Sequence, residues 1–395
     1  MSELFSVSAH WAQAFDEAGL QQWAQELRRR LGPKRVSMGL VFMAPKFFPH
    51  AQATLEILRV HARIPLLAGC SGTGLVAGDS ELEDNPGLAL ALYHLPGADL
   101  KAAHFTQEQV QAVTGTDYWP AETGAAPLAT HGWLAFLDPF TMDCERWLRD
   151  FDAAYAPRPI VGGLASGDPG EQNTQIYLNG EVFNEGGVAV AVGGEVTLAG
   201  VIAQGCTPIG ETWTLTGVEH NIIHGIANRR AYDVLADTWK GLSTEEQRKT
   251  QGNLFIGLVI NEYLDDFHRG DFLVRNVLGA DPNSGAIAVG ALPRAGQIMQ
   301  FQRRDATAAS LDMTELLARA KRAFSGATIL GGCLCCCNGR GKNLFESPSH
   351  DARMVQQQLG PFGLAGFFCN GEIGPVGERS FLHGNTASLA LFVKR

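Results

Sequence analysis

The apolar residues of this chain fall into short runs that are separated by glycine-rich or polar loops, as is typical of buried strands in a layered fold. In the first such region, a strand, a helix, a strand, a glycine loop and a further strand are predicted at residues 36–43, 50–61, 66–68, 69–74 and 87–93. The β-branched run at 36–43 and the loop sequence GCSGTG are the clearest of these signals.

The same order of five elements recurs twice, which predicts an internal duplication. The second copy is expected at residues 133–137, 143–153, 159–161, 162–167 and 187–192. The third copy is expected at residues 328–333, 350–359, 363–365, 366–374 and 387–393.

A different pattern separates the second and third copies. Short strands, a helix and a three-stranded meander are predicted at residues 221–226, 231–239, 254–260, 272–278, 286–289 and 297–302, followed by a helix at 308–324. The first residues predict a docking helix over 9–30 with a basic end. We therefore expect an α/β (α+β) fold in which helices flank mixed sheets, with a docking segment at 1–34 and domains at 35–220 and 221–395.

Composition narrows the class of protein. Only 18% of the residues are charged and 45% are apolar, which indicates a folded chain with large cores. The net charge of −10 argues against nucleic acid as a partner, and no apolar run approaches the about 20 residues of a membrane span. Residues 1–11 lack the features of a secretory signal, so a cytoplasmic location is expected, with the eight cysteines as thiols.

Glycine is the compositional outlier, with 46 of 395 residues, or nearly 12%, against about 7% in an average protein. Part of the excess falls in the three predicted glycine loops. The first of these loops is interpreted either as a tight turn or as a loop that binds an anion. It is not a phosphate-binding P-loop, because no lysine follows its glycines. Only the third loop, with Cys369, Asn370 and Glu372 among its glycines, carries enough chemistry to predict a site.

The C-terminal part of the chain contains the motifs FLVRN, DP-x-x-G, Q-F-Q-x-RDA, C-x-GRG, LF-E-x-P-x-HD, GFFCNGEIGPVG and LHG-x-TAS. Together with GCSGTG upstream, these motifs resemble the FIST family over most of the chain from about residue 36. The resemblance implies an intracellular sensory protein that binds a small ligand such as an amino acid. No segment typical of a fused signalling output is present, so a separate signalling partner is expected, while the oligomeric state is left open.

The resemblance also implies a set of ligand-facing residues in these motifs. They are Arg275, Asn276, Arg304, Asp305, Cys337, Asn338, Gly339, Arg340, Gly341, His350, Asp351, Cys369, Asn370, Gly371, Glu372, Gly374 and His383. An amino acid needs a cation for its carboxylate and a carboxylate for its ammonium group, and Arg340 and Glu372 offer these. The alternative for Arg275, Arg304, Asp305 and Asp351 is that they form buried structural ion pairs.

The cysteines at 333, 335, 336 and 337 allow three interpretations: core packing, a reactive thiol at Cys337 or Cys369, or a thiolate metal site. Their spacing argues against a structural zinc site, since Cys333, Cys335 and Cys337 lie on one side of a strand and Cys336 on the other. No metal ion and no cofactor is therefore predicted.

Two other functions remain open. A thiol hydrolase or transferase could use Cys337 or Cys369 as nucleophile, His350 or His383 as base, and Asp351 or Glu372 to orient the base. A protein-interaction scaffold would instead require an exposed apolar patch. The residues favour a ligand-binding protein over an enzyme, because no motif fixes a catalytic geometry.

Overall fold

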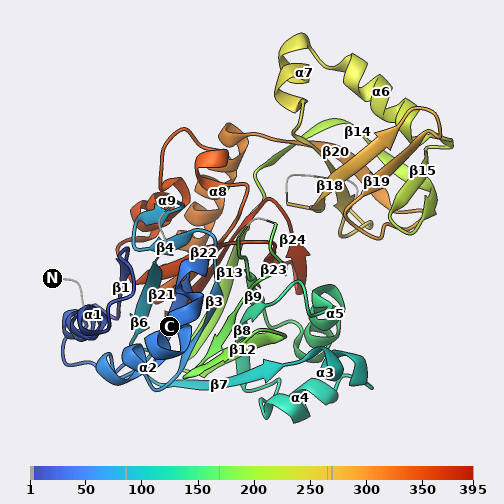
Figure 1. Cartoon of the computed structure of the whole chain (residues 1–395). Helices are drawn as coiled ribbons and strands as arrows, with labels where there is room; N and C mark the ends of the chain where they lie inside the picture. Colours follow the sequence, from blue (N-terminus) through green and yellow to red (C-terminus); the bar gives the residue numbers. More distant parts are fainter. Residues whose placement is uncertain (1–3, 85–86, 169, 265, 268–269, 395) are drawn as a thin grey trace. The chain divides into compact units, whose positions relative to one another are not determined.

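The computed structural model describes residues 4–84, 87–168, 170–264, 266–267 and 270–394 (Figure 1). The chain forms two compact units. The first unit contains Met1–Ile202, Thr314–Leu382 and Thr386–Arg395, and the second contains Ala203–Met313 and His383–Asn385. Each unit is therefore assembled from segments that are not continuous in the sequence. The domain boundary near residue 220 stays a prediction.

The first unit is built from three six-stranded sheets. The first sheet has the order β1 (Ser6–Trp11), β6 (Leu88–Tyr93), β2 (Met38–Met43), β3 (Leu67–Ser71), β10 (Ile176–Leu178) and β11 (Glu181–Phe183). The second has the order β7 (Ala98–Phe105), β12 (Gly187–Gly194), β8 (Thr130–Leu137), β9 (Ile160–Leu164), β23 (Glu372–Val376) and β24 (Arg379–His383). The third has the order β13 (Val196–Ala203), β25 (Ala387–Lys394), β21 (Thr328–Cys337), β22 (Leu364–Cys369), β4 (Leu75–Ala77) and β5 (Ser80–Leu82).

The three sheets repeat one plan, and each predicted copy of the duplication supplies the centre of one sheet. In every copy the first two strands pair in parallel, and the last strand pairs antiparallel with the first. The short hairpin that follows the glycine loop joins a different sheet each time: β4–β5 joins the third sheet, β10–β11 the first and β23–β24 the second. No copy therefore completes its sheet alone, and the exchange of hairpins interlocks the three copies.

Apolar side chains fill the space between the sheets because nearly every residue of the central strands is buried. Three aromatic rings meet in the largest core cluster: the centroid of Phe42 lies 5.3 Å from that of Phe136 and 4.9 Å from that of Phe367. The outer faces are covered by helices: α1 (Glu17–Arg30) and α2 (Ala51–His61) in one cluster, α5 (Cys144–Tyr155) in another. The other helical segments of this unit are η1 (Pro45–His50), α3 (Gln107–Ala112), α4 (Tyr118–Thr123), η2 (Gly341–Asn343) and α9 (His350–Leu359).

The predicted N-terminal helix over 9–30 is wrong in its first part. Residues Ser6–Trp11 form strand β1, which pairs antiparallel with β6, and helix α1 begins only at Glu17. Asp16 caps this helix by accepting a hydrogen bond from the backbone N–H of Gly19 at 3.1 Å. Tertiary pairing with β6 outweighs the helical spacing of the apolar residues before Asp16.

The second unit contains one seven-stranded sheet. Its order is β14 (Cys206–Glu219), β20 (Ile298–Arg304), β17 (Leu254–Val259), β18 (Phe272–Asp281), β19 (Ala286–Val289), β15 (Ile222–Ile226) and β16 (Arg229–Arg230). The helices α6 (Ala231–Gly241) and α7 (Thr244–Thr250) belong to this unit, and the chain returns to the first unit within α8 (Ala306–Ala323). The three strands predicted at 272–278, 286–289 and 297–302 are confirmed, but the meander is wrong: β18 pairs with β19, whereas β20 pairs with β14 and β17 instead of β19. Among the described residues, no helix combines the length and the apolar character of a membrane span.

Candidate functional site

The three glycine loops of the first unit occupy equivalent positions, because one glycine in each copy makes the same close backbone contact. A Cβ atom on Gly69, Gly162 or Gly366 would lie 1.7, 1.8 or 1.7 Å from a backbone carbonyl oxygen of the neighbouring parallel strand. Only glycine allows the two strands to approach in this way. The residue four positions later is polar in every copy, and these residues are Thr73, Ser166 and Asn370.

These three polar residues lie together where the loops meet. The backbone N–H of Thr73 donates to Ser166 Oγ at 2.9 Å, and the Ser166 hydroxyl donates to the carbonyl oxygen of Phe368 at 2.5 Å. The side-chain amide of Asn370 donates to the carbonyl oxygen of Ala165 at 3.0 Å. The loops of all three copies therefore converge on one place.

The predicted loops at 337–341 and 366–374 lie side by side, since Cys337 pairs with Cys369 at the ends of β21 and β22. Asn338 bridges them: its Oδ1 accepts from Thr73 Oγ1 at 2.7 Å, and its Nδ2 donates to Asn370 Oδ1 at 2.9 Å. Thr73, Asn338 and Asn370 thus form a chain of hydrogen bonds between the first and third copies.

A cavity of about 510 Å³ opens at this junction, which is within the usual range for small-ligand sites. Its lining combines hydroxyl and amide groups with carboxylates and two aromatic rings. The lining residues are Thr73, Gly74, Glu83, Asp84, Phe140, Gly167, Asp168, Gly170, Glu171, Asn338, Lys342, Asn343, Phe368 and Asn370.

The lining of this cavity is acidic. Four carboxylates, those of Glu83, Asp84, Asp168 and Glu171, face a single ammonium group, that of Lys342. The Lys342 side chain forms an ion pair with Asp84, and its backbone N–H donates to both carboxylate oxygens of Glu83 at 3.0 Å. The excess of negative charge favours a ligand that carries a positive group.

Arg340 belongs to the same loop as Asn338 and Lys342, but its side chain turns into the protein. It is fully buried and forms a bidentate ion pair with Asp351, with Nε to Oδ2 at 2.6 Å and Nη2 to Oδ1 at 2.9 Å. His350 Nδ1 lies 3.0 Å from Asp351 Oδ1, and the His350 ring stacks on Phe345. Burial alone would raise the pKa of the Asp351 carboxyl, but Arg340 and His350 outweigh it and hold the pKa below its usual range.

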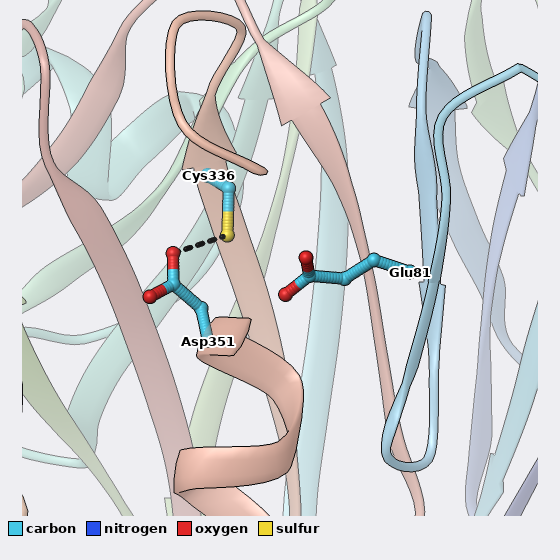
Figure 2. A group of neighbouring side chains, drawn as sticks. All are labelled: Glu81, Cys336 and Asp351. Atoms are coloured by element: carbon cyan, nitrogen blue, oxygen red, sulfur yellow. Dashed lines mark hydrogen bonds between the residues drawn. The ribbon is translucent and has the colours of Figure 1, made fainter. Parts of the chain in front are cut away.

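Two further groups, Cys336 and Glu81, complete this buried polar cluster, and Figure 2 draws them together with Asp351. Cys336 extends from β21 with its sulfur 3.7 Å from Asp351 Oδ2, and Glu81 reaches in from the β4–β5 hairpin. Glu81 Oε1 accepts a hydrogen bond from the backbone N–H of Ala352 at 2.9 Å. Burial, and then the nearby charge of Asp351, raise the pKa of Glu81 to about 7.

Glu372 is also fully buried, at the start of β23. Its Oε2 accepts from the backbone N–H and the hydroxyl of Thr386 at 3.0 and 2.7 Å, and its Oε1 accepts from the Cys369 thiol at 3.2 Å. Burial raises the pKa of Glu372 to about 7, although the hydrogen bonds from Thr386 oppose this shift.

Glu372 should make the stability of the protein depend on pH. Because its pKa is higher in the folded chain than in the unfolded chain, its stabilising contribution is complete below about pH 4.5 and is lost as the pH rises through about 7. Between pH 5 and pH 8, we expect Glu372 to lower the free energy of unfolding of the wild type by about 2–3 kcal/mol. The Glu372→Gln variant should lack this decrease, and urea unfolding at the two pH values measures it. Glu378→Gln, in the exposed turn after β23, is the control, and identical pH profiles for wild type and Glu372→Gln would contradict the prediction.

The predicted site residues divide between the two units. Arg275, Asn276, Arg304, Asp305 and His383 belong to the second unit. There Arg304 Nη1 donates to Asn385 Oδ1 at 3.1 Å, and Asn385 Nδ2 donates to Asn276 Oδ1 at 3.2 Å. Asp305 accepts from the backbone N–H of Ala308 at 2.7 Å at the start of α8.

The remaining predicted residues belong to the first unit, and they differ in position. Asn338 and Asn370 line the cavity, whereas Arg340, Asp351 and Glu372 are buried behind it with partners inside the protein. Gly339 and Gly341 lie in the loop after β21, Gly371 follows β22, and Gly374 lies in β23. The structure therefore supports a structural role for Asp351, which forms its buried ion pair with Arg340. Contact between a ligand and the predicted residues stays a prediction.

The cysteines alternate about strand β21 as predicted. Cys333 and Cys335 lie in the central core, and Cys336 faces Asp351 on the other side. The Cys369 thiol is fully buried, and burial raises its pKa well above the ordinary value, which is unfavourable for a nucleophilic thiolate. All eight cysteines lie in the described residues; Cys337 is half-buried and the other seven are buried.

Sequence reasoning missed several residues that line the cavity or the cluster behind it. The first two glycine loops gave no chemical signal on their own, so Thr73 and Ser166 were not predicted. Glu81, Glu83 and Lys342 were missed because their partners are far away in the sequence. One signal was available: aligning the three copies on their close-contact glycines places Thr73, Ser166 and Asn370 at the same position.

Comparison with known proteins agrees with the sequence motifs. The FIST N domain matches residues 37–229, and the FIST C domain matches residues 231–375. The uncharacterized protein Rv0628c of Mycobacterium tuberculosis is 36% identical over 328 residues, which is 83% of each chain. The uncharacterized protein Mb0898c of Mycobacterium bovis is 34% identical over 329 residues, again 83% of each chain.

The solved structures that match include one titled "Cyanuric acid hydrolase: evolutionary innovation by structural concatenation". It shares 10% identity and a TM-score of 0.32 over 100% of this chain and 99% of that chain. The two FIST domains together match most of the chain, and the mycobacterial relatives exceed 30% identity over most of their length. This chain therefore belongs to the FIST family.

Proposed function

We propose that this protein binds a small, amine-bearing metabolite of the amino-acid class in the cavity where the three glycine loops meet. FIST domains are linked in general to small-ligand sensing and signalling. The observation that carries the proposal is the convergence of Thr73, Asn338 and Asn370, from separate loops, on one acidic cavity of about 510 Å³. The cytoplasmic location and the separate signalling partner expected from the sequence are parts of this proposal.

Each part of the ligand has a chemically suited group in the lining. The ammonium group is attracted by the carboxylates of Glu83 and Asp168, and the carboxylate is attracted by Lys342. The amides of Asn338 and Asn370 offer both donors and acceptors, so they fix the orientation of a polar ligand. The rings of Phe140 and Phe368 supply the apolar part of the wall.

In this proposal, Arg340 positions the loop rather than contacting the ligand. Its ion pair with Asp351 anchors the middle of the loop, while Asn338, Lys342 and Asn343 on either side line the cavity. Such an anchor holds the donors and acceptors in place before the ligand arrives, which lowers the entropic cost of binding.

The proposal is tested by a thermal-shift screen of amino acids and other small amines, followed by calorimetry on the best hit. We expect Asn338→Ala and Asn370→Ala each to weaken binding about fivefold to tenfold, because a neutral hydrogen bond contributes ~1 kcal/mol. The same ligand should bind more weakly at high salt, since the lining is acidic.

The matched control is Asn283→Ala, which changes an exposed asparagine in a turn of the second unit. It should leave the affinity unchanged. If a ligand is found and its affinity is unaffected by both cavity substitutions, the ligand binds elsewhere and the proposed site is wrong.

A further inference from the structure

The cluster of Glu81, Cys336 and Asp351 brings together three metal-binding side chains from distant segments. One possible ligand atom from each residue lies within 4.8 Å of the other two. As Figure 2 shows, the Glu81 carboxylate points toward the sulfur of Cys336 and the carboxylate of Asp351. Glu81 comes from the first copy of the duplication, whereas Cys336 and Asp351 come from the third.

A second observation points to a missing partner within this cluster. Glu81 is only 7% exposed, and its Oε2 is buried with no hydrogen-bond partner among the described residues. Arg340 Nη1 is buried without a partner in the same way. Buried polar atoms are nearly always satisfied, so an unsatisfied oxygen on a carboxylate that points toward a thiol and a second carboxylate indicates an unfilled site.

We propose that Glu81, Cys336 and Asp351 bind a divalent transition-metal ion of the zinc type. A thiolate and two carboxylates are a suitable donor set for zinc, and a fourth position would be left for water. With zinc–sulfur and zinc–oxygen bonds of about 2.3 and 2.1 Å, tetrahedral geometry places these ligand atoms about 3.6 Å apart. The distance between Cys336 Sγ and Asp351 Oδ2 is 3.7 Å.

The neighbouring Arg340 is compatible with this ion. Asp351 Oδ2 accepts from Arg340 Nε at 2.6 Å, and a carboxylate oxygen has a second lone pair that remains for the metal. Carboxylates that bind metals are themselves commonly hydrogen-bonded by outer groups. The two carboxylates, the thiolate and the guanidinium sum to a charge of −2 when ionised, which a divalent ion neutralises.

The experiment uses the full chain, expressed with added Zn²⁺, with the metal content measured by mass spectrometry. The metal is then exchanged for Co²⁺, which reports a thiolate ligand through its sulfur-to-metal charge-transfer absorption. We expect about one ion per chain in the wild type, together with this absorption. A folded wild-type protein that holds no metal, or a Co²⁺ protein without the thiolate band, would overturn the proposal.

Two substitutions locate the ion, and a third serves as the control. The loss of a group that only hydrogen-bonds to a metal ligand typically lowers metal affinity about 10–100-fold. Cys336 would bind the ion directly, so Cys336→Ser should lower the affinity by at least about 100-fold and abolish the absorption. Glu81→Gln keeps an acceptor for the Ala352 N–H and should also weaken binding, which covers the case that Cys336→Ser fails to fold. Cys337→Ser, next to Cys336 but on the other side of the strand, should bind like the wild type. Equal binding by wild type, Cys336→Ser and Glu81→Gln would place the ion elsewhere and refute the assignment.

Discussion

Replacing Arg340 with alanine should lower the free energy of unfolding by about 3–5 kcal/mol, because the substitution leaves the buried carboxylate of Asp351 without its cation. Both side chains of this ion pair are at most 1% exposed, so water cannot replace the guanidinium. Urea unfolding measures the effect. Arg340→Lys should cause a smaller but clear loss, since a lysine keeps the charge but cannot form the bidentate pair.

The control for this prediction is another arginine in an ion pair. Arg29 pairs with Glu26 on the surface of α1, and their side chains are 72% and 55% exposed. Arg29→Ala should change stability by less than about 1 kcal/mol, because exposed pairs contribute little. Similar losses from Arg29→Ala and Arg340→Ala would show that the Arg340–Asp351 pair does not stabilise the fold as the structure indicates.

Replacing Gly366 with alanine should destabilise the protein by about 3 kcal/mol or more, at the upper end of the range for overpacking. A Cβ at this position would lie 1.7 Å from the carbonyl oxygen of Leu334, and backbone atoms of a central parallel strand cannot move aside cheaply. The third glycine loop should shift with the strand, so ligand binding at Asn370 should weaken as well. Urea unfolding and calorimetry measure the two effects.

Gly115→Ala is the matched control for this substitution. Its Cβ would meet no atom within 4 Å, and its backbone does not require glycine. The expected change in stability is within about 0.5 kcal/mol. If Gly366→Ala were equally mild, the close approach of β21 and β22 could not be the reason for glycine at this position.

Most elements of the chain could be predicted from the sequence, because the signals for them are local. The apolar runs that form β2, β8 and β21, and the helices α2, α5 and α9, follow from the periodicity of a few neighbouring residues. For the same reason the threefold repetition of strand, helix, strand, loop and strand is visible in the sequence. The strand β1 was missed because its assignment depends on pairing with β6, not on its own residues.

The exchange of hairpins between the copies could not be predicted. Val76 in β4 pairs with Gly366 in β22, far away in the chain, and nothing in either segment specifies that partner. This pairing brings Glu81 close to Cys336 and Asp351, and it brings Glu83 into contact with Lys342 in the loop after β21. The acidic lining of the cavity and the buried cluster of Figure 2 therefore exist only in the folded chain.

Arg340 shows the same difference between what local sequence predicts and what contacts between distant segments decide. Its place among glycines, near Asn338, predicts a cation available to a ligand, but the direction of the side chain depends on where α9 places Asp351. The central strands and helices of the three copies follow from the amino-acid sequence, because hydrophobic periodicity and glycine act over short distances, whereas strands such as β1, β7, β13 and β14 were not predicted. Which loops meet in one cavity and which charges are paired depends on contacts between segments that are distant in the chain, so these features became visible only in the folded protein.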